Sequence, residues 1–359
     1  MRLPIVLSLP ALLASAPLLA QAAGQPQSSA PTTVPKQPFV KADAAAAVSD
    51  LAAALDDYFV FPGPGHAYAA MLRSKLASGA YSNFEDAGAF AAAVTADLQA
   101  VHKDGHLRLQ VIAPDEQNGA RDLRGFSAAS GVERAGWLAD GVAYIDFKGF
   151  PGNKATLDDV SSFLAKHRDA KTLIIDERGN RGGGIAEMNL IFRQIFAKPT
   201  ILLHMDTRSA TERDHASPIS EADSMRTISA PDSLARREHF VVPAADQGGL
   251  ATATIYLLVA NRTASAGEHF ALALKRTHRA TLIGETTKGA GNFGAMVPMG
   301  TGYAAFIPVG RTFDPDTGEG WEGTGVHPDI AVPADKALDE ALRLAGINAK
   351  GDIALAALR

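Results

Sequence analysis

The sequence predicts an α/β fold in which a mixed, largely parallel sheet is flanked by helices, with a helical subdomain before it. Segments 172–176 and 254–260 are apolar almost throughout, as strands buried on both faces of a parallel sheet are. Amphipathic segments of helical spacing alternate with these strands, and this order favours parallel pairing. Residues 42–101 are instead rich in alanine with apolar positions at helical spacing, which predicts helices.

Residues 1–23 have the features of an export signal. Arg2 supplies a positive start, residues 5–19 form an apolar run that prolines interrupt, and the small-residue signal AQA follows. The run is too short and too broken for a membrane-spanning helix. We therefore expect cleavage after Ala22 or Ala23, no stable membrane insertion, and a periplasmic or secreted mature chain. A signal anchor is the alternative.

The composition excludes several classes of protein. No cysteine is present, so a disulfide scaffold and a thiol nucleophile are excluded. A net charge of -5 and the lack of a long basic run argue against nucleic acid or an anionic membrane surface as a partner. Residues 24–41 are rich in Pro, Ser and Thr, which is typical of a linker.

Residues 42–112 form the predicted N-terminal helical subdomain. Its helices are expected at 42–59, 66–76 and 84–101. A Lys-Asp-Gly turn then leads into a strand at 107–111, so His106 lies at the mouth of a turn, where its ring could project into a cleft. An ordinary surface histidine is the alternative. His102 and His106 have the i, i+4 spacing of a helical metal site, but the Asp-Gly between them disfavours a helix.

The predicted α/β core spans residues 136–347 and begins with a hairpin at 136–150 and a helix at 156–167. The buried strand at 172–176 leads into DERGNRGGG and then a helix at 185–196. Glycines between a strand and a helix let backbone N–H groups approach a negatively charged atom. A tight structural turn is the alternative. A nucleotide-binding loop is not favoured, because the glycines match neither GxGxxG nor a P-loop.

Residues 205–249 follow a short strand at 201–204 and turn polar, with scattered prolines and mixed charges. They give no chemical signal. We expect a long excursion over the cleft that acts as a lid or a substrate-recognition loop.

The strand at 254–260 is followed by a tight polar connection and a helix that opens at Ser265. A hydroxyl there lies where the first helical N–H groups are unpaired and the helix dipole favours negative charge. Ser265 to Glu268 also matches a capping box, in which the serine only caps the helix. The local sequence leaves both interpretations open, because a nucleophile needs a base, an oxyanion site and an orienting acid from elsewhere.

The C-terminal part completes the core. A strand at 280–284 precedes a glycine-rich loop at 285–294, and Glu322 lies in a compact loop at 321–329. Taken singly, Glu322 is as well explained by a solvated carboxylate. The remaining predicted elements are a hairpin, a strand and a helix, at 296–309, 330–332 and 335–344.

Four separated blocks occur in the order found in one family: VHKDGHLRL, TLIIDERGNRGGG, LLVANRTASAGEHFALALKRTHRATLIGETTKGAG and EGTGVHPDI. They resemble the tail-specific (C-terminal processing) and tricorn-core serine peptidase superfamily. The segment LDDYFVFPGPGHAYAAMLRSKLASGAYS also resembles the N-terminal region of the interphotoreceptor retinoid-binding protein branch. The resemblance covers most of residues 42–335 and implies a ClpP/crotonase-like core.

The resemblance also implies a set of site residues. Ser265 in TASAGE falls at the family's nucleophile, and the N–H of Ala266 would be one oxyanion donor. The pair Gly182 and Gly183 falls where the second donor arises, without deciding between them. The histidine base of tricorn-like members and their orienting acid match His106 and Glu322. No cofactor and no metal are implied.

Two departures separate the chain from the processing-protease branch. Those enzymes use a lysine within Gly-Lys-Gly, whereas Ala290 stands at that position here, and Lys288 lies two residues earlier. A Ser/Lys dyad is therefore not expected. Residues 113–135 are also far too few for the PDZ domain that those proteases carry.

The resemblance implies an exported serine peptidase that acts on peptides or unfolded proteins. Two alternatives use the same scaffold. One is a non-catalytic protein that binds a retinoid- or fatty-acid-like apolar ligand. The other is a small-molecule esterase or amidase, which would need the same catalytic groups.

Overall fold

The computed structural model describes residues 37–112, 129–215, 219 and 223–359. The predicted signal peptide and most of the predicted linker therefore lie outside the described residues. Residues 37–359 form one compact unit. Within the described ranges, no helix is both long and apolar enough to cross a membrane.

The N-terminal region contains the three predicted helices, α1 (Lys41–Tyr58), α2 (Pro62–Ala77) and α3 (Ala87–Val101). Pro62 lies in the first turn of α2, where its missing N–H costs nothing, and Asp86 caps α3 by accepting the N–H of Ala89. The apolar faces of the helices share one core with Tyr303 and Ile307. The short strand β1 (Arg108–Val111) follows α3 and pairs with the strand that carries these two residues.

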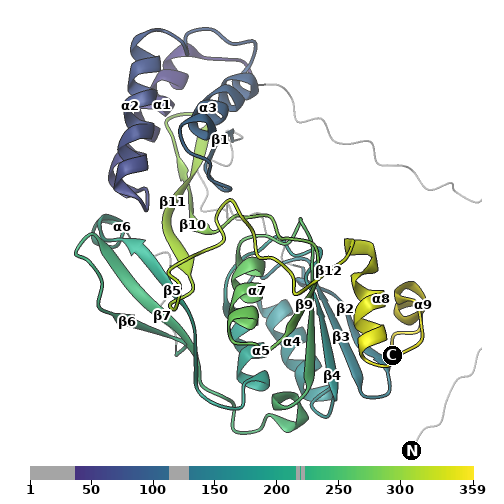
Figure 1. Cartoon of the computed structure of the whole chain (residues 1–359). Coiled ribbons are helices and arrows are strands. Elements are labelled where there is room, and N and C mark those ends of the chain that lie inside the picture. Colours follow the sequence, from purple (N-terminus) through teal and green to yellow (C-terminus); the bar gives the residue numbers. More distant parts are fainter. Residues whose placement is uncertain (1–36, 113–128, 216–218, 220–222) are drawn as a thin grey trace, which may run out of the picture. The chain divides into compact units, whose positions relative to one another are not determined.

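The predicted largely parallel sheet is present and has six strands in the order β12-β9-β8-β4-β3-β2 (Figure 1). All neighbours are parallel except β2 and β3, which form the predicted hairpin. The strands are β2 (Val132–Ala139), β3 (Val142–Phe147), β4 (Thr172–Asp176), β8 (Thr254–Val259), β9 (Thr281–Gly284) and β12 (Ile330–Ala331).

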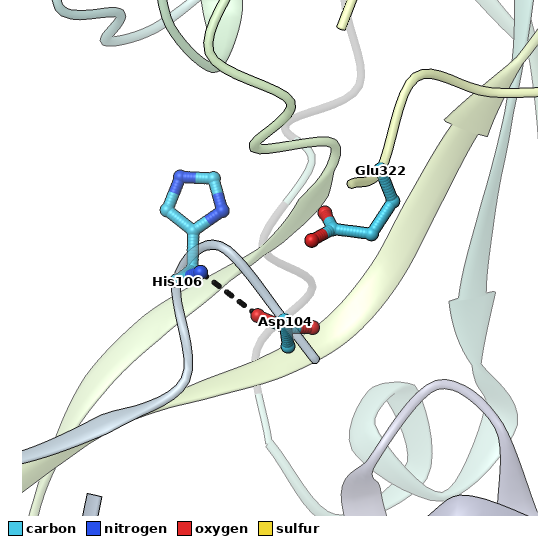
Figure 2. Close-up of side chains that lie close together, drawn as sticks. All are labelled: Asp104, His106 and Glu322. Carbon is cyan, nitrogen blue, oxygen red and sulfur yellow. Dashed lines mark hydrogen bonds between the residues drawn. The ribbon is translucent and has the colours of Figure 1, made fainter. Parts of the chain in front are cut away.

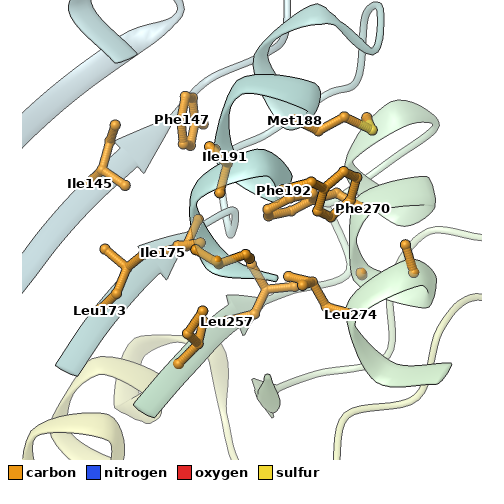
Figure 3. Close-up of a cluster of buried hydrophobic side chains, with 14 of the residues drawn as sticks. Ile145, Phe147, Leu173, Ile175, Met188, Ile191, Phe192, Leu257, Phe270 and Leu274 are labelled. Atoms are coloured by element: carbon orange, nitrogen blue, oxygen red, sulfur yellow. The ribbon is translucent and has the colours of Figure 1, made fainter. Parts of the chain in front are cut away.

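Helices cover both faces of this sheet, which explains why its central strands are apolar throughout. On one face lie α4 (Lys154–Lys166), α5 (Ala186–Ile195) and α7 (Ala266–Arg276), and on the other α8 (Ala337–Leu344) and α9 (Gly351–Ala356). Figure 3 shows Phe192 of α5 and Phe270 of α7 packed together above Leu257. Each fully buried side chain of this kind stabilises the fold by about 1.5–3 kcal/mol.

A second six-stranded sheet contains the strands predicted at 107–111 and 201–204 and the hairpin predicted at 296–309, but its other two strands and their union in one sheet were not predicted. It is wholly antiparallel, with the path β1-β11-β5-β7-β6 and with β10 paired to β11. Its further strands are β5 (Thr200–Arg208), β6 (Met225–Ile228), β7 (Leu234–Val241), β10 (Asn292–Pro298) and β11 (Tyr303–Phe313).

Residues 205–249, predicted as a long polar excursion, contain regular elements of this sheet. The strand expected at 201–204 continues to Arg208, a short helix α6 (Ser209–Asp214) follows, and β6 and β7 come later in the segment. Polar sequence misled the prediction because charged side chains in these strands pair with one another. Asp206, fully buried, binds both Arg236 and Arg311. Whether this region acts as a lid stays a prediction.

Candidate active site

Ser265 lies at the corner between β8 and α7, where the sequence predicted it. Its backbone φ is 55°, in the left-handed region that residues other than glycine rarely occupy. Such a conformation costs about 1–3 kcal/mol and persists only where the surrounding structure enforces it. Here Thr263 supplies part of that structure, since its hydroxyl donates to the carbonyl of Glu177 at 2.7 Å and accepts the N–H of Ala260 at 3.0 Å.

Ser265 and Glu268 form the predicted capping box, and Glu268 also makes further contacts. Its Oε2 accepts the N–H of Ser265 at 2.9 Å. The same buried carboxylate accepts hydrogen bonds from the Thr287 hydroxyl and from the N–H groups of Gly289 and Ala290. Burial raises the pKa of Glu268, and these donors oppose that rise. Glu268 therefore ties the serine corner to the glycine-rich loop that follows β9.

The glycine loop after β4 lies directly against Ser265. A Cβ added to Gly182 would lie 2.7 Å from the Cβ of Ser265 and 3.1 Å from the backbone nitrogen of Ala266. One added to Gly183 would lie 2.0 Å from the carbonyl oxygen of Phe150. Both glycines have positive φ, 98° and 137°. Only glycine fits at either position without strain.

Hydrogen bonds distinguish the two glycines. The N–H of Gly182 donates to the side-chain oxygen of Asn180 at 2.8 Å, so it is already occupied. The N–H of Gly184 donates to Phe150, and the carbonyl of Gly182 accepts from Phe150. Among the residues that the structure describes, the N–H groups of Gly183 and Ala266 have no acceptor. Two unoccupied donors therefore remain beside Ser265.

His106 lies in a turn that Asp104 holds. One oxygen of the buried Asp104 carboxylate accepts the N–H groups of His106 and Leu107, each at 2.8 Å (Figure 2). Its other oxygen accepts from the side chain of Asn292 at 2.9 Å. The imidazole stacks on Phe306, with ring centroids 4.9 Å apart and planes inclined by 22°.

Glu322 points its carboxylate toward the imidazole of His106 (Figure 2). One ring nitrogen of His106, one carboxylate oxygen of Asp104 and one of Glu322 lie within 4.8 Å of one another. Glu322 also accepts the N–H of Gly105 at 2.6 Å, and therefore holds the peptide unit next to His106. Glu322 therefore contacts the backbone of the turn that carries His106, while an orienting contact with the ring itself stays a prediction. The Nδ1 atom of His106 is buried and has no hydrogen-bond partner in the described part of the chain.

Burial sets the protonation states of this pair. It lowers the pKa of His106 to about 4, although Asp104 opposes the shift. It raises the pKa of Glu322 to about 6, and the neighbouring charge of Asp104 adds to the rise. At neutral pH the imidazole is therefore neutral and able to accept a proton, while the carboxylate is ionised.

One loop joins the two halves of the site. Of the four consecutive N–H groups of residues 289–292, the first two donate to Glu268 and the last two to Glu322. Gly105 packs against this loop, because a Cβ added there would lie 2.9 Å from the Cα of Ala290. The serine corner and the histidine turn are therefore both attached to the same short segment.

Two further predictions concern metals and lysine. His102 ends α3 with an extended backbone, so His102 and His106 do not share a helix. Asp104, His106 and Glu322 are close enough to bind a metal ion, but every carboxylate oxygen of the two acids already accepts a hydrogen bond. At the position where processing proteases have their lysine, this chain has Ala290, which is buried, whereas the nearby Lys288 is exposed.

The structure attaches Ser265, Glu322 and the turn that carries His106 to the loop at residues 289–292. One expected contact, between Ser265 and His106, is missing. Within the described residues, no hydrogen bond joins the Ser265 hydroxyl to the imidazole of His106. Such contacts are often long in the absence of substrate. Sequence reasoning missed Asp104, Asn180, Asn292 and Phe306 as site residues. Only Asp104 had a local signal, the Asp-Gly turn.

Comparison with known proteins agrees with this architecture. The model for peptidase family S41 matches residues 141–332, more than half of the chain. A second model, described as the N-terminal domain of peptidase S41 in eukaryotic IRBP, matches residues 38–132. A chloroplastic carboxyl-terminal-processing peptidase of Arabidopsis thaliana is 34% identical over 85 residues, which are 24% of this chain and 17% of that protein.

Solved structures share the fold at low sequence identity. The photosystem II D1 C-terminal processing protease is 16% identical with a TM-score of 0.52, over 85% of this chain and 98% of that one. A putative peptidase from Parabacteroides merdae is 15% identical with a TM-score of 0.55, over 88% and 96%. The tricorn protease gives 14% and 0.51, over 89% of this chain and 37% of that one. The family match shows that the chain belongs to peptidase family S41, a family of serine peptidases.

Proposed function

We propose that this chain hydrolyses peptide bonds with Ser265 as the nucleophile. The observation that carries the proposal is the strained Ser265 at the start of α7, beside two N–H groups that have no acceptor among the described residues. Any helix start leaves an N–H such as that of Ala266 unpaired. A helix cap alone needs neither the strain at Ser265 nor the second unoccupied donor, of Gly183.

The reaction would proceed in two acyl transfers. The hydroxyl oxygen of Ser265 attacks the peptide carbonyl carbon, and its proton passes to the neutral imidazole of His106. The carbonyl oxygen becomes an oxyanion that the N–H groups of Ala266 and Gly183 bind. The C–N bond then breaks as the amine takes the proton from the imidazolium. Water repeats the sequence on the acyl-enzyme and releases the acid.

Glu322 would stabilise the imidazolium that forms in each step. Its carboxylate is ionised at neutral pH, points toward the ring, and holds the Gly105 peptide beside it. Asp104 would fix the turn, since it binds the backbone N–H of His106 itself.

We infer that the substrates are peptides or unfolded proteins and that cleavage occurs near their C-termini. Relatives named as C-terminal-processing proteases support this inference. The signal-like residues 1–23 support action outside the cytoplasm, in the periplasm or after secretion. Unstructured peptides with a free or an amidated C-terminus would be compared, and the free form should be cleaved faster. Equal rates would contradict the preference for a C-terminus.

Substitution of the nucleophile tests the proposal. Ser265→Ala should lose turnover of an unstructured peptide while its melting temperature stays within a few degrees. Ser233→Ala, at an exposed serine of the connection before β7, serves as the control and should keep full activity. An active Ser265→Ala protein would overturn the assignment, as would a loss of activity that only follows unfolding.

Binding of an apolar ligand is the second candidate, because residues 38–132 match the N-terminal domain found in eukaryotic IRBP. Saturable binding of retinol or a fatty acid by a protein that hydrolyses no peptide would favour it. Cleavage of activated esters without cleavage of peptides would instead favour an esterase.

A further inference from the structure

Asn180 lies behind the glycine loop and makes contacts on both sides of the proposed oxyanion site. Its side chain is fully buried. The amide oxygen accepts the N–H of Gly182 at 2.8 Å, and the amide nitrogen donates to the carboxyl of Glu177 at 3.0 Å. Its backbone carbonyl accepts the N–H of Ala264 at 3.1 Å. One residue therefore contacts the glycine loop and the serine corner together.

The contact with Gly182 selects which N–H group remains available. By accepting the N–H of Gly182, Asn180 fixes the peptide unit between residues 181 and 182, where the chain enters the glycine loop. Phe150 fixes the next two units, since its N–H donates to the carbonyl of Gly182 at 2.8 Å and its carbonyl accepts the N–H of Gly184 at 2.7 Å. These hydrogen bonds fix the backbone on both sides of Gly183. The N–H of Gly183 itself has no acceptor in the described part of the chain.

Asn180 also packs against α7. A Cβ added to Gly267 would lie 3.3 Å from the side-chain carbon Cγ of Asn180. The glycine at 267 therefore lets the amide approach the first turn of the helix that begins with Ala266. The two unoccupied N–H groups, of Gly183 and Ala266, are supported by the same side chain.

Glu177 determines which way the amide of Asn180 faces. Its side chain is fully buried, its Oε1 accepts from Asn180, and its Oε2 has no partner in the described ranges. Burial raises the pKa of Glu177 well above its usual value, and the charge of Asp176 adds to the rise. Arg178 offers no compensation, because its guanidinium binds Asp176. This rise favours the uncharged form of the carboxyl, and Oε1 is the acceptor that faces the Asn180 amide.

We propose that Asn180 is a positioning residue that fixes the glycine loop so that the Gly183 N–H group faces the oxyanion, and that the carboxyl of Glu177 holds the Asn180 amide in the required orientation. A reversed amide would turn its NH2 group toward the N–H of Gly182, and the two donors would repel each other. Both hydrogen bonds of the Asn180 amide, from Gly182 and to Glu177, form in one orientation only. The proposal rests on the proposed function for its catalytic consequence.

Four variants test the proposal. Asn180→Ala and Glu177→Leu remove the amide and the acceptor that orients it. Both should lower kcat by about 100-fold, the usual effect of losing one oxyanion donor, with KM within about twofold. Glu177→Gln keeps an uncharged side chain with an acceptor oxygen and should restore most of kcat. Asn189→Ala removes a different, half-buried asparagine, which bonds to His239 and Ser224, and should leave kcat nearly unchanged.

Amide hydrogen exchange supplies a measurement that needs no activity. The N–H of Gly182 should be protected in the wild type and in Glu177→Gln, and should exchange at least tenfold faster in Asn180→Ala and Glu177→Leu. If the wild type hydrolyses nothing, the proposed function fails while the exchange pattern still tests the positioning. The inference would be overturned if Glu177→Gln lost as much kcat and Gly182 protection as Glu177→Leu. It would also be overturned if Asn180→Ala kept the wild-type kcat and exchange rate.

Discussion

Two glycine-rich loops follow strands of the parallel sheet, and they use their backbone N–H groups in opposite ways. In residues 289–292 every N–H is occupied, two by Glu268 and two by Glu322. In residues 182–184 the outer N–H groups are occupied and the middle one, of Gly183, has no acceptor among the described residues. A glycine-rich loop can bind an anion only where such a donor is left over. The first loop is therefore a scaffold, and the second is the candidate oxyanion site.

The largest effect is expected from adding a methyl group to the glycine loop at residues 182–184. In Gly182→Ala the new Cβ would collide with Ser265 at 2.7 Å, so the loop and the serine must move apart. We expect kcat/KM to fall by about 1000-fold, as the donor and the nucleophile are displaced together. Steady-state hydrolysis of a peptide measures it. Gly179→Ala is the matched control, since its new Cβ would have no neighbour closer than 3.7 Å, and near-normal activity of Gly182→Ala would refute the assignment.

The next effect concerns the acid held by the loop at 289–292. The pKa of Glu322 is about 6, so its negative charge is present above pH 6 and is lost as the pH falls through that value. The wild-type kcat/KM should therefore fall below pH 6, and further near pH 4 as His106 becomes protonated. Glu322→Gln should lower the plateau on the order of 100-fold and remove the inflection near 6. Glu319→Gln, at an exposed position nearby, should keep the wild-type profile, and an unchanged inflection in Glu322→Gln would contradict the assignment.

A smaller effect is expected where the scaffold loop meets the serine corner. In Glu268→Gln the new NH2 group would face donors that now bind a carboxylate, at Ser265 and Ala290. Unpaired buried donors cost about 1–3 kcal/mol, which predicts a melting temperature lower by several degrees. Thermal unfolding by circular dichroism measures it. As the control, Glu340→Gln removes a carboxylate from an exposed pair with Arg343 and should keep the melting temperature of the wild type. An unshifted Glu268→Gln would show that the loop does not depend on this carboxylate.

The smallest effect concerns the ring that shields His106. Phe306 stacks on the imidazole, and the charged groups around it are Asp104, Arg108, Lys288 and Glu322. Phe306→Leu admits water and should raise the pKa of His106 from about 4 toward its usual value, with activity at neutral pH changed less than threefold. The imidazole C–H resonances report the titration directly. Phe306→Tyr keeps the ring and should keep the low pKa, and an unmoved resonance in Phe306→Leu would exclude shielding by Phe306.

The sequence predicted the parallel sheet well because its strands are buried on both faces and therefore apolar, as in Ile174 and Leu257. It missed β6 and β7 of the antiparallel sheet, because β7 carries Arg236, Arg237 and Glu238, whose partners come from other elements. Ion pairs across strands remove the apolar pattern on which strand prediction depends.

The same limit applies to the candidate site. Ser265 was visible because a helix start has a local pattern, and the family blocks supplied His106 and Glu322. Asn180 and Asn292 gave no signal, because an asparagine in a turn looks the same whether or not its side chain is buried. The partner of Asn292 is Asp104, 188 residues away along the chain. Only the folded chain brings such pairs together.

Covalent labelling by a fluorophosphonate, followed by mass mapping of the modified peptide, tests the central claim most directly. The wild type should carry one adduct on Ser265, and His106→Ala should label much more slowly while remaining folded. An intact, folded wild-type protein that takes up no label, or takes it up at another residue, would contradict the account.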